Sequence, residues 1–128
     1  MLKIAFETLF VFPPLENTRN PAKYFLFMSK WANYGISAVR FDPQHTKVEK
    51  VIAQLDLEEI FGTPSEYARH EIVAALKRNF SFVTIFTRED GKWKKGQLLR
   101  IANINGAEYL KTADDGRAVD NLENLPSF

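Results

Sequence analysis

The sequence predicts an α+β protein: a small antiparallel sheet in ββαβββ order, packed by one main helix and preceded by a strand–helix extension. The chain has 128 residues, enough to bury a core without a metal or a disulfide. Its composition, 45% hydrophobic and 26% charged, is ordinary for a globular domain. Several alternating apolar segments surround one segment with strong helix-start signals. We therefore divide the chain into an apolar extension, residues 1–33, and an α+β domain, residues 34–128.

The extension begins with strand-like alternation over residues 2–12, which Pro13-Pro14 ends. Asn20-Pro21 then has the form of a helix start, a capping residue followed by proline in the first turn. We expect a helix over residues 22–33, and its apolar residues recur at spacings of four and three. The candidate interface residues of this segment are Tyr24, Phe25, Met28 and Trp31.

These side chains have two interpretations. Packing of the aromatic face on the main domain is the first expectation. The alternative is an apolar surface for a protein partner or for a second copy in a homo-oligomer. Met28 is also an alternative start of translation, which would make the upstream segment an accessory.

The first hairpin of the domain contains an ambiguous segment. Ile36–Phe41 is expected to be a strand, closed by the turn Asp42-Pro43-Gln44-His45. Over residues 47–53, the helical spacing of the apolar positions favours a helix. The β-branched residues and the preceding tight turn suit a return strand instead. The residue pattern alone slightly favours the helix.

The clearest helix signal covers Pro64–Asn79. Thr63 is the expected N-cap, Pro64 lies in the first turn, and Glu66 completes a capping box. The expected buried stripe of this helix is Ala68, Ile72, Ala75 and Leu76.

A meander of strands follows the helix. Phe80–Arg88 and Leu98–Ile104 alternate as strands on either side of an Asp90-Gly91 turn. Asn105-Gly106 is the strongest hairpin signal of the chain, because both central residues of that turn need a positive φ. Ala107–Thr112 is the expected return strand.

The C-terminal half resembles a bacterial and archaeal family of small domains of unknown function. The family pattern is a Tyr-apolar-Lys/Arg-Thr strand followed by a D-N-L-x-x-L-P tail. The segments that carry the resemblance are Gly96–Ile104, Gly106–Thr112 and Asp120–Pro126, with further likeness at 36–40 and 48–51. The resemblance covers residues 34–128, implies a ββαβββ domain and favours a strand over residues 47–53. It implies no activity.

The tail has a physical interpretation of its own. Asp120 and Glu123 are expected to cap one helical turn. Leu122 and Leu125, three residues apart, can then pin the chain end on the sheet, while Asp120 and Asn121 satisfy free backbone N–H groups. We expect a structural clasp, and a ligand contact is the alternative.

Catalytic chemistry finds little support in the sequence. There is no cysteine, which excludes a disulfide scaffold, a thiolate nucleophile and Cys-ligated metals. His70-Glu71 would begin a zinc-protease motif, but Ala74 stands where the second histidine is needed. We assign no catalytic residue, no metal ligand and no cofactor. Charged residues interrupt every apolar window near the N-terminus, so we expect a cytoplasmic protein without membrane contact.

Charge is distributed unevenly although the formal net charge is only +1. Residues 69–100 are locally basic, whereas residues 42–66 and 101–128 are locally acidic. The sequence Lys92-Trp93-Lys94-Lys95 at a hairpin places an aromatic ring among cations, which suits phosphate contact and base stacking. The candidate binding residues are Lys77, Arg78, Arg88, Lys92, Trp93, Lys94 and Lys95.

These observations predict a non-catalytic binding module that contacts an acidic partner, nucleic acid or acidic protein, through the basic hairpin. The alternative is an assembly or regulatory module that binds another protein through the aromatic extension.

Overall fold

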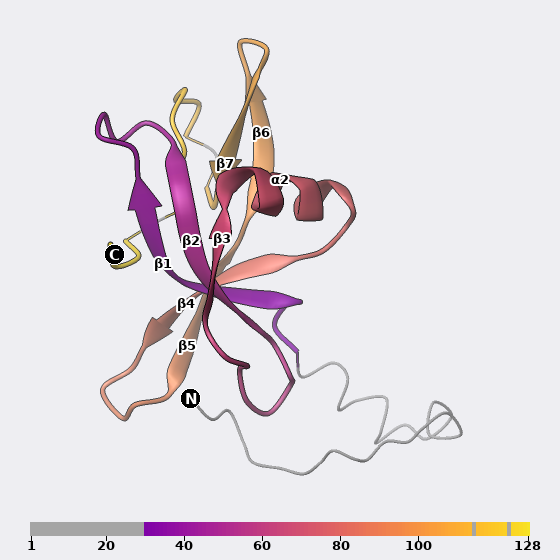
Figure 1. Cartoon of the computed structure of the whole chain (residues 1–128), viewed down its shortest axis with the longest axis vertical. Coiled ribbons are helices and arrows are strands. Elements are labelled where there is room, and N and C mark those ends of the chain that lie inside the picture. The colour runs from indigo at the N-terminus through magenta and orange to yellow at the C-terminus, as the bar shows by residue number, and fades with distance from the viewer. Residues whose placement is uncertain (1–29, 114, 123) are drawn as a thin grey trace.

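The computed structural model describes residues 30–113, 115–122 and 124–128, and this part of the chain forms seven strands and one helix. The elements are β1 (Tyr34–Phe41), β2 (Val48–Leu55), β3 (Ser65–Ala68), α2 (Arg69–Lys77), β4 (Phe82–Thr87), β5 (Trp93–Leu98), β6 (Arg100–Ile104) and β7 (Ala107–Lys111). Five strands form a sheet of order β3-β2-β1-β4-β5, and β6 pairs only with β7 (Figure 1).

The α+β class with a small sheet is confirmed, but the ββαβββ topology is wrong. The chain inserts β3 before the helix and breaks the expected 98–104 strand at Leu99. The sheet is also not purely antiparallel, because β1 and β4 run parallel, with Tyr34 opposite Phe82. Most of the expected strand–helix extension, residues 1–29, lies outside the described residues. Its described end, residues 30–33, is not helical.

Strand β2 settles the ambiguous 47–53 segment. It lies between β1 and β3 in the sheet, and Val48, Val51 and Ala53 are buried. The preference for a helix from the residue spacing was therefore wrong, and the strand implied by the resemblance is correct. The turn before β2 is held by Asp42, whose carboxylate accepts hydrogen bonds from the Thr46 N–H (2.7 Å) and hydroxyl (2.9 Å).

The helix begins five residues later than the sequence predicts. Residues 65–68 pair with β2 as an edge strand, with Glu66 opposite Ile52, so the capping box at Thr63 does not form. Glu71 instead accepts a hydrogen bond from the Ala68 N–H at 2.8 Å. Pairing with the outer edge of β2 satisfies the backbone of 65–68, which outweighs the local helix-start signals.

The last strands follow the predicted turn chemistry. Asn105 and Gly106 have φ values of 52° and 83°, so the expected hairpin between β6 and β7 is confirmed. Strand β5 contains a bulge near Gly96, where a Cβ would overlap Thr84 Oγ1. The same hydroxyl oxygen accepts a hydrogen bond from the Gln97 N–H at 2.9 Å, so only glycine fits this close approach.

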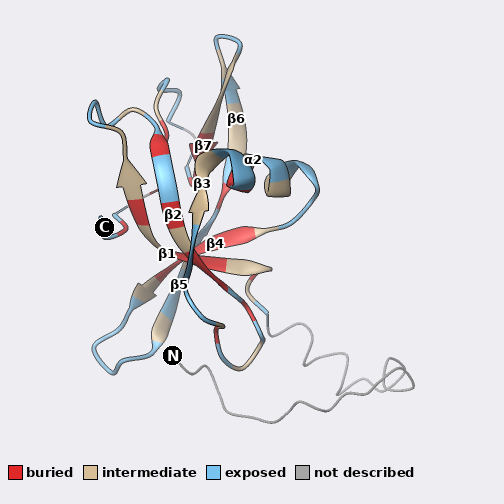
Figure 2. Ribbon diagram, in the orientation of Figure 1, coloured by how far each residue is buried: buried red, intermediate tan, exposed pale blue. Residues whose placement is uncertain are grey.

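Two apolar clusters lie on the sheet. The larger contains residues of β1, β2, α2, β4, β7 and the tail, with Ile36, Val51, Ile72 and Leu110 almost fully buried. Figure 2 shows this burial concentrated where β1, β2 and β4 meet. The smaller cluster consists of Ala32, Phe61, Val83 and Ile85, with Trp31 and Trp93 packed against it.

Candidate functional site

The basic hairpin predicted from the sequence is formed by β4 and β5. Its turn is closed by hydrogen bonds from the Arg88 N–H to Lys92 O (2.7 Å) and from the Gly91 N–H to Arg88 O (3.0 Å). Asp90 accepts the Lys92 N–H (3.0 Å) and pairs with Arg88 Nη2 (3.3 Å). The Lys92 hydrogen bond, with the charges of Arg88 and Lys92, lowers the pKa of Asp90 below its ordinary value. The turn is therefore closed by interactions among its own residues.

The outer part of this hairpin is a two-stranded ribbon. Strand β1 pairs with β4 only as far as Thr84, so the residues beyond it have β5 as their sole strand neighbour within the described chain. Figure 1 shows the ribbon projecting from one end of the sheet. Its tip therefore stands away from the rest of the sheet.

Cations lie on both faces of this ribbon. Lys95 is opposite Ile85 and Lys94 is opposite Phe86, and residues paired across strands share a face whereas neighbours along a strand alternate. Lys92, Lys94 and Lys95 are exposed and form no ion pair within the described residues. The ribbon thus has a ridge of positive charge rather than one flat basic face.

Trp93 is turned toward the protein. Its ring contacts Phe61 edge-on at 6.0 Å between centroids, and Phe61 contacts Trp31 in the same way at 5.7 Å. Trp93 is half-buried, and its indole Nε1 is buried without a hydrogen-bond acceptor in the described part of the chain. The hairpin therefore presents its cations to solvent, and the ring packs in the smaller cluster.

The other candidate residues lie elsewhere. Lys77 and Arg78 are at the end of α2, which Figure 1 places far from the hairpin tip. Lys77 is paired with Glu108 at 2.9 Å, so these two cations do not extend the ridge. Trp31 belongs to the smaller cluster, and the remaining interface candidates, Tyr24, Phe25 and Met28, lie outside the described residues.

The tail forms a second centre of interactions around Asp120. This carboxylate is fully buried and accepts hydrogen bonds from the backbone N–H groups of Val48 and Leu110, both at 2.8 Å. Arg69 donates to it through Nε (2.8 Å) and Nη2 (3.0 Å) and reaches Glu108 O with Nη2 (3.0 Å). The hydrogen bond to Asp120 raises the pKa of Arg69 above its ordinary value. One side chain thereby joins β2, α2, β7 and the tail.

The sequence predicts the capping role of Asp120 but not that of Arg69, which lies outside the buried stripe expected for the Pro64–Asn79 helix. No local signal was available, because the predicted helix start at Pro64 puts Arg69 in the second turn, and only the observed start places it in the first. A cation in the first turn of a helix opposes the helix dipole, so Arg69 needed a compensating anion from another part of the chain.

A buried lysine lies beside this centre. Lys111 is fully buried, and its Nζ forms an ion pair with Asp115. Asp115 also accepts hydrogen bonds from Asn121 Nδ2 (3.1 Å) and the Arg117 N–H (3.0 Å). The hydrogen bond from Lys111 is the main reason that the pKa of Asp115 lies far below its ordinary value.

The tail forms isolated bridges at Asn121 and Ser127 and has no helical residue in its described part, and Glu123, expected to cap a helical turn with Asp120, lies outside the described residues. Leu122 and Leu125 are buried in the main core. Val39 donates its N–H to Pro126 O (2.9 Å), and Phe128 returns its N–H to Val39 O (3.3 Å). The tail therefore pairs with β1 like a strand and fixes the chain end on the sheet. We call the tail, together with the side-chain contacts of Asp120 and Asp115, the clasp.

A shallow groove of about 560 Å³ runs between α2 and β2, lined by Val48, Glu49, Ala68, Arg69, His70, Val73, Ala74 and Lys77. His70 is exposed, and His45 stacks on Phe41 at 4.0 Å between ring centroids. No group of three His, Asp or Glu side chains in the described ranges is placed to hold a metal ion. Among the same residues, no helix is long and apolar enough to cross a membrane.

Comparison with known proteins places the chain in a family. The family model described as "Protein of unknown function (DUF3892)" matches residues 35–126. The chain belongs to this family. The match spans the DUF3892 domain from β1 through the clasp, and it confirms the resemblance to a family of small domains of unknown function. Neither a curated protein nor a solved structure matches the chain.

Proposed function

We propose that this DUF3892 protein is a non-catalytic binding module whose β4–β5 ribbon contacts the phosphates of a nucleic acid. The observation that carries the proposal is the ridge formed by Lys92, Lys94 and Lys95, three exposed cations without ion-pair partners among the described residues. Elsewhere on the described surface, Lys50 and Lys77 are paired with Glu66 and Glu108, and exposed cations without an ion pair, such as Lys47, Arg100 and Arg117, lie on separate segments of the chain.

The geometry of the ridge favours a double-stranded nucleic acid. The major groove of duplex DNA is about 12 Å wide and admits a two-stranded β-ribbon between its two phosphate walls. Lys94 and Lys95 point to opposite faces of such a ribbon, so a ribbon that enters the groove edge-on directs each of them toward a different wall. Contacts of this kind give affinity without reading sequence. The packed position of Trp93 supports phosphate contact over base stacking.

The test is fluorescence anisotropy of labelled duplex and single-stranded DNA and RNA at about 50 and 200 mM salt. Each phosphate contact contributes about −0.9 to the slope of log K against log salt for duplex DNA. Three lysine contacts therefore give a slope of about −2.7, which weakens binding about 40-fold over this range. The variant Lys92→Ala/Lys94→Ala/Lys95→Ala should lose both the affinity and most of the salt dependence.

A matched control changes the net charge equally at other places. Lys47→Ala/Lys50→Ala/Arg117→Ala removes three exposed cations away from the ribbon. It should keep most of the duplex affinity if the ridge is the binding site. Equal losses in the two variants would mean non-specific charge attraction and would overturn the assignment of the site. Absence of binding at the lower salt concentration would overturn nucleic acid as the partner, and assembly through the aromatic extension would become the leading function.

A further inference from the structure

Three buried polar atoms lie on the elements that meet at Phe61 in the smaller cluster. They are Gln54 Oε1, Glu59 Oε1 and Trp93 Nε1, and no residue that the structure describes forms a hydrogen bond with them. Gln54 is 5% exposed and lies opposite Gly35, where an added Cβ would come within 2.9 Å of Phe61 Cε1. Residues paired across strands share a face, so Gln54 lies on the face that Phe61 covers. Trp93 contacts Phe61 directly, and Glu59 precedes it by two residues.

A partner for these atoms needs hydrogen-bond donors and acceptors. The two oxygens accept, whereas the indole N–H donates, and buried polar atoms in proteins are paired in the great majority of cases. The partner also needs apolar groups. On the loop with Phe61, Leu57 and Ile60 are 48% and 36% exposed, and Leu98, opposite Val83 of the cluster, is 55% exposed. An apolar peptide segment has both kinds of group, because its backbone supplies the donors and acceptors.

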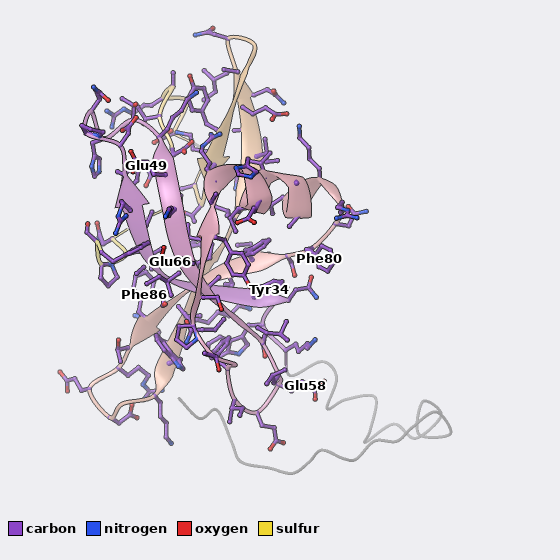
Figure 3. The ribbon with its side chains drawn as sticks, viewed as in Figure 1. Tyr34, Glu49, Glu58, Glu66, Phe80 and Phe86 are labelled. Atoms are coloured by element: carbon purple, nitrogen blue, oxygen red, sulfur yellow. The ribbon has the colours of Figure 1, made fainter. Side chains whose placement is uncertain are left out.

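The chain has such a segment directly before the cluster. Trp31 packs against the cluster, and its N–H donates to Asp56 Oδ2 (2.8 Å). The Asp56 N–H donates to Asn33 O (2.8 Å), so the chain enters the domain at this loop. Figure 3 shows Glu58 on the same loop, at the end of the molecule where the described chain begins. The preceding residues 22–29 include five large apolar side chains, Tyr24, Phe25, Leu26, Phe27 and Met28.

We infer that residues 22–29 dock on the smaller cluster of their own chain, over Leu57, Ile60 and Leu98. Eight extended residues span up to about 28 Å, enough to cross the cluster from its edge at Trp31. Direct linkage makes the docking intramolecular, so the chain's own segment has an effective concentration that a separate partner lacks. A chain whose translation starts at Met28 would leave the cluster uncovered. This inference goes beyond nucleic-acid binding and does not depend on it.

Paramagnetic broadening in NMR spectra of the full chain tests the docking. The chain has no cysteine, so Lys23→Cys provides a single attachment site for a spin label. The label should broaden the amide resonances of Leu57 and Leu98. It should leave those of the Asn105-Gly106 turn, at the opposite end of the molecule (Figure 1), unchanged. Absence of selective broadening at Leu57 and Leu98 would overturn the inference.

A mixed sample identifies the chain that supplies the segment. Spin-labelled chains without isotope are mixed with isotope-labelled chains that have no spin label. Docking within one chain should leave all resonances of the isotope-labelled chains sharp. Broadening at Leu57 and Leu98 in this sample would show that a second copy supplies the segment, and it would overturn docking within the chain.

Tryptophan fluorescence provides an independent readout. Trp31 and Trp93 are the two tryptophans of the chain and both pack against the smaller cluster, so their emission reports on its cover. Phe25→Ser/Met28→Ser removes two apolar side chains of the docking segment. It should shift the emission to longer wavelength and increase quenching by acrylamide. Emission and quenching equal to those of the wild type would overturn the inference.

Phe6→Ser/Phe10→Ser is the matched control, because it removes two apolar side chains from an earlier part of the extension. This variant should keep the wild-type emission, and an equal shift in both variants would overturn the assignment to residues 22–29. Circular dichroism should show both variants folded. Both variants keep every lysine of the ridge, so duplex binding in the anisotropy assay should persist. Failure of the docking is thereby distinguished from failure of the proposed function.

Discussion

Removing the carboxylate of Asp120 should be among the most damaging single changes in this protein. The carboxylate receives four hydrogen bonds, two from buried backbone N–H groups of Val48 and Leu110 and two from Arg69. In Asp120→Ala, both backbone donors lose their acceptor in a place that water does not reach. Arg69 keeps only its bond to Glu108 O.

The magnitude follows from these losses. A buried donor without an acceptor costs about 1–3 kcal/mol. Arg69 is 22% exposed at its side chain, so water compensates part of its loss and the cost is below the roughly 3–5 kcal/mol of a fully buried pair. We expect the free energy of unfolding to fall by about 3–6 kcal/mol, against a typical total of about 5–15 kcal/mol.

Urea unfolding followed by circular dichroism measures this loss. With an m-value of about 1–3 kcal/mol/M, the midpoint should fall by at least about 1 M, or the variant should be unfolded without urea. Asp90→Ala is the control: Asp90 also accepts a backbone N–H, but in the exposed hairpin turn, so its midpoint should barely change. A loss below about 1.5 kcal/mol for Asp120→Ala, half of the smallest expected value, would refute the argument that this residue holds the clasp.

Two further predictions concern stability. Gly96→Ala should lower the thermal midpoint strongly, because its Cβ would overlap Thr84 Oγ1 and lie 2.8 Å from Thr84 O; an unchanged midpoint in a thermal melt would show that the bulge can open. The ion pair with Lys111 lowers the folded-state pKa of Asp115, so its stabilisation is present above the unfolded pKa of about 4 and is lost as the pH falls below it. Asp115→Asn should therefore flatten the loss of stability between about pH 4 and 2, and an unchanged pH profile would contradict this cause.

Local signals predicted those elements that depend on local conformation. The Asn105-Gly106 hairpin requires two positive φ values in sequence, and few residue pairs other than Asn-Gly supply them. Strand β3 was missed because Thr63, Pro64 and Glu66 have ideal helix-start chemistry. Its strand conformation depends on the free edge of β2, a distant partner that no local pattern reveals. The parallel pairing of β1 with β4 was missed for the same reason.

The candidate site, like the fold, could be predicted from the sequence only in part. The cations of the ribbon could be read from the sequence, but their division between two faces depends on the register of β5 against β4. The burial of Lys111 could not be predicted from the sequence. Neighbouring residues of a strand point to opposite faces, so the buried Leu110 would leave Lys111 on the outer face of β7. Its burial depends on Asp115, which the turn after β7 brings to the ammonium group.

In the segments that carry the family resemblance, several side chains hold the fold together. In the Gly106–Thr112 and Asp120–Pro126 segments, Leu110, Lys111, Asp120 and Leu122 are all buried, and their polar groups are paired within the clasp. These buried and paired residues explain the fold of the chain, but they are not free to bind a partner. A binding function is therefore better sought in side chains that the fold does not use, of which the lysines of the ribbon are the clearest group.

The lysines of β5 have a second physical role, which two double variants can separate from binding. Strand β5 is an edge of the five-stranded sheet, and charged side chains on edge strands prevent pairing with other chains. Protection of an edge requires charge of either sign, whereas contact with phosphate requires positive charge. Lys94→Glu/Lys95→Glu should therefore remain folded and free of aggregates in light scattering while losing duplex binding in the anisotropy assay. Lys94→Val/Lys95→Val should lose binding and also aggregate. If the glutamate variant binds duplex DNA as well as the wild type does, the lysines of β5 serve only the edge, and the proposed phosphate contact is wrong.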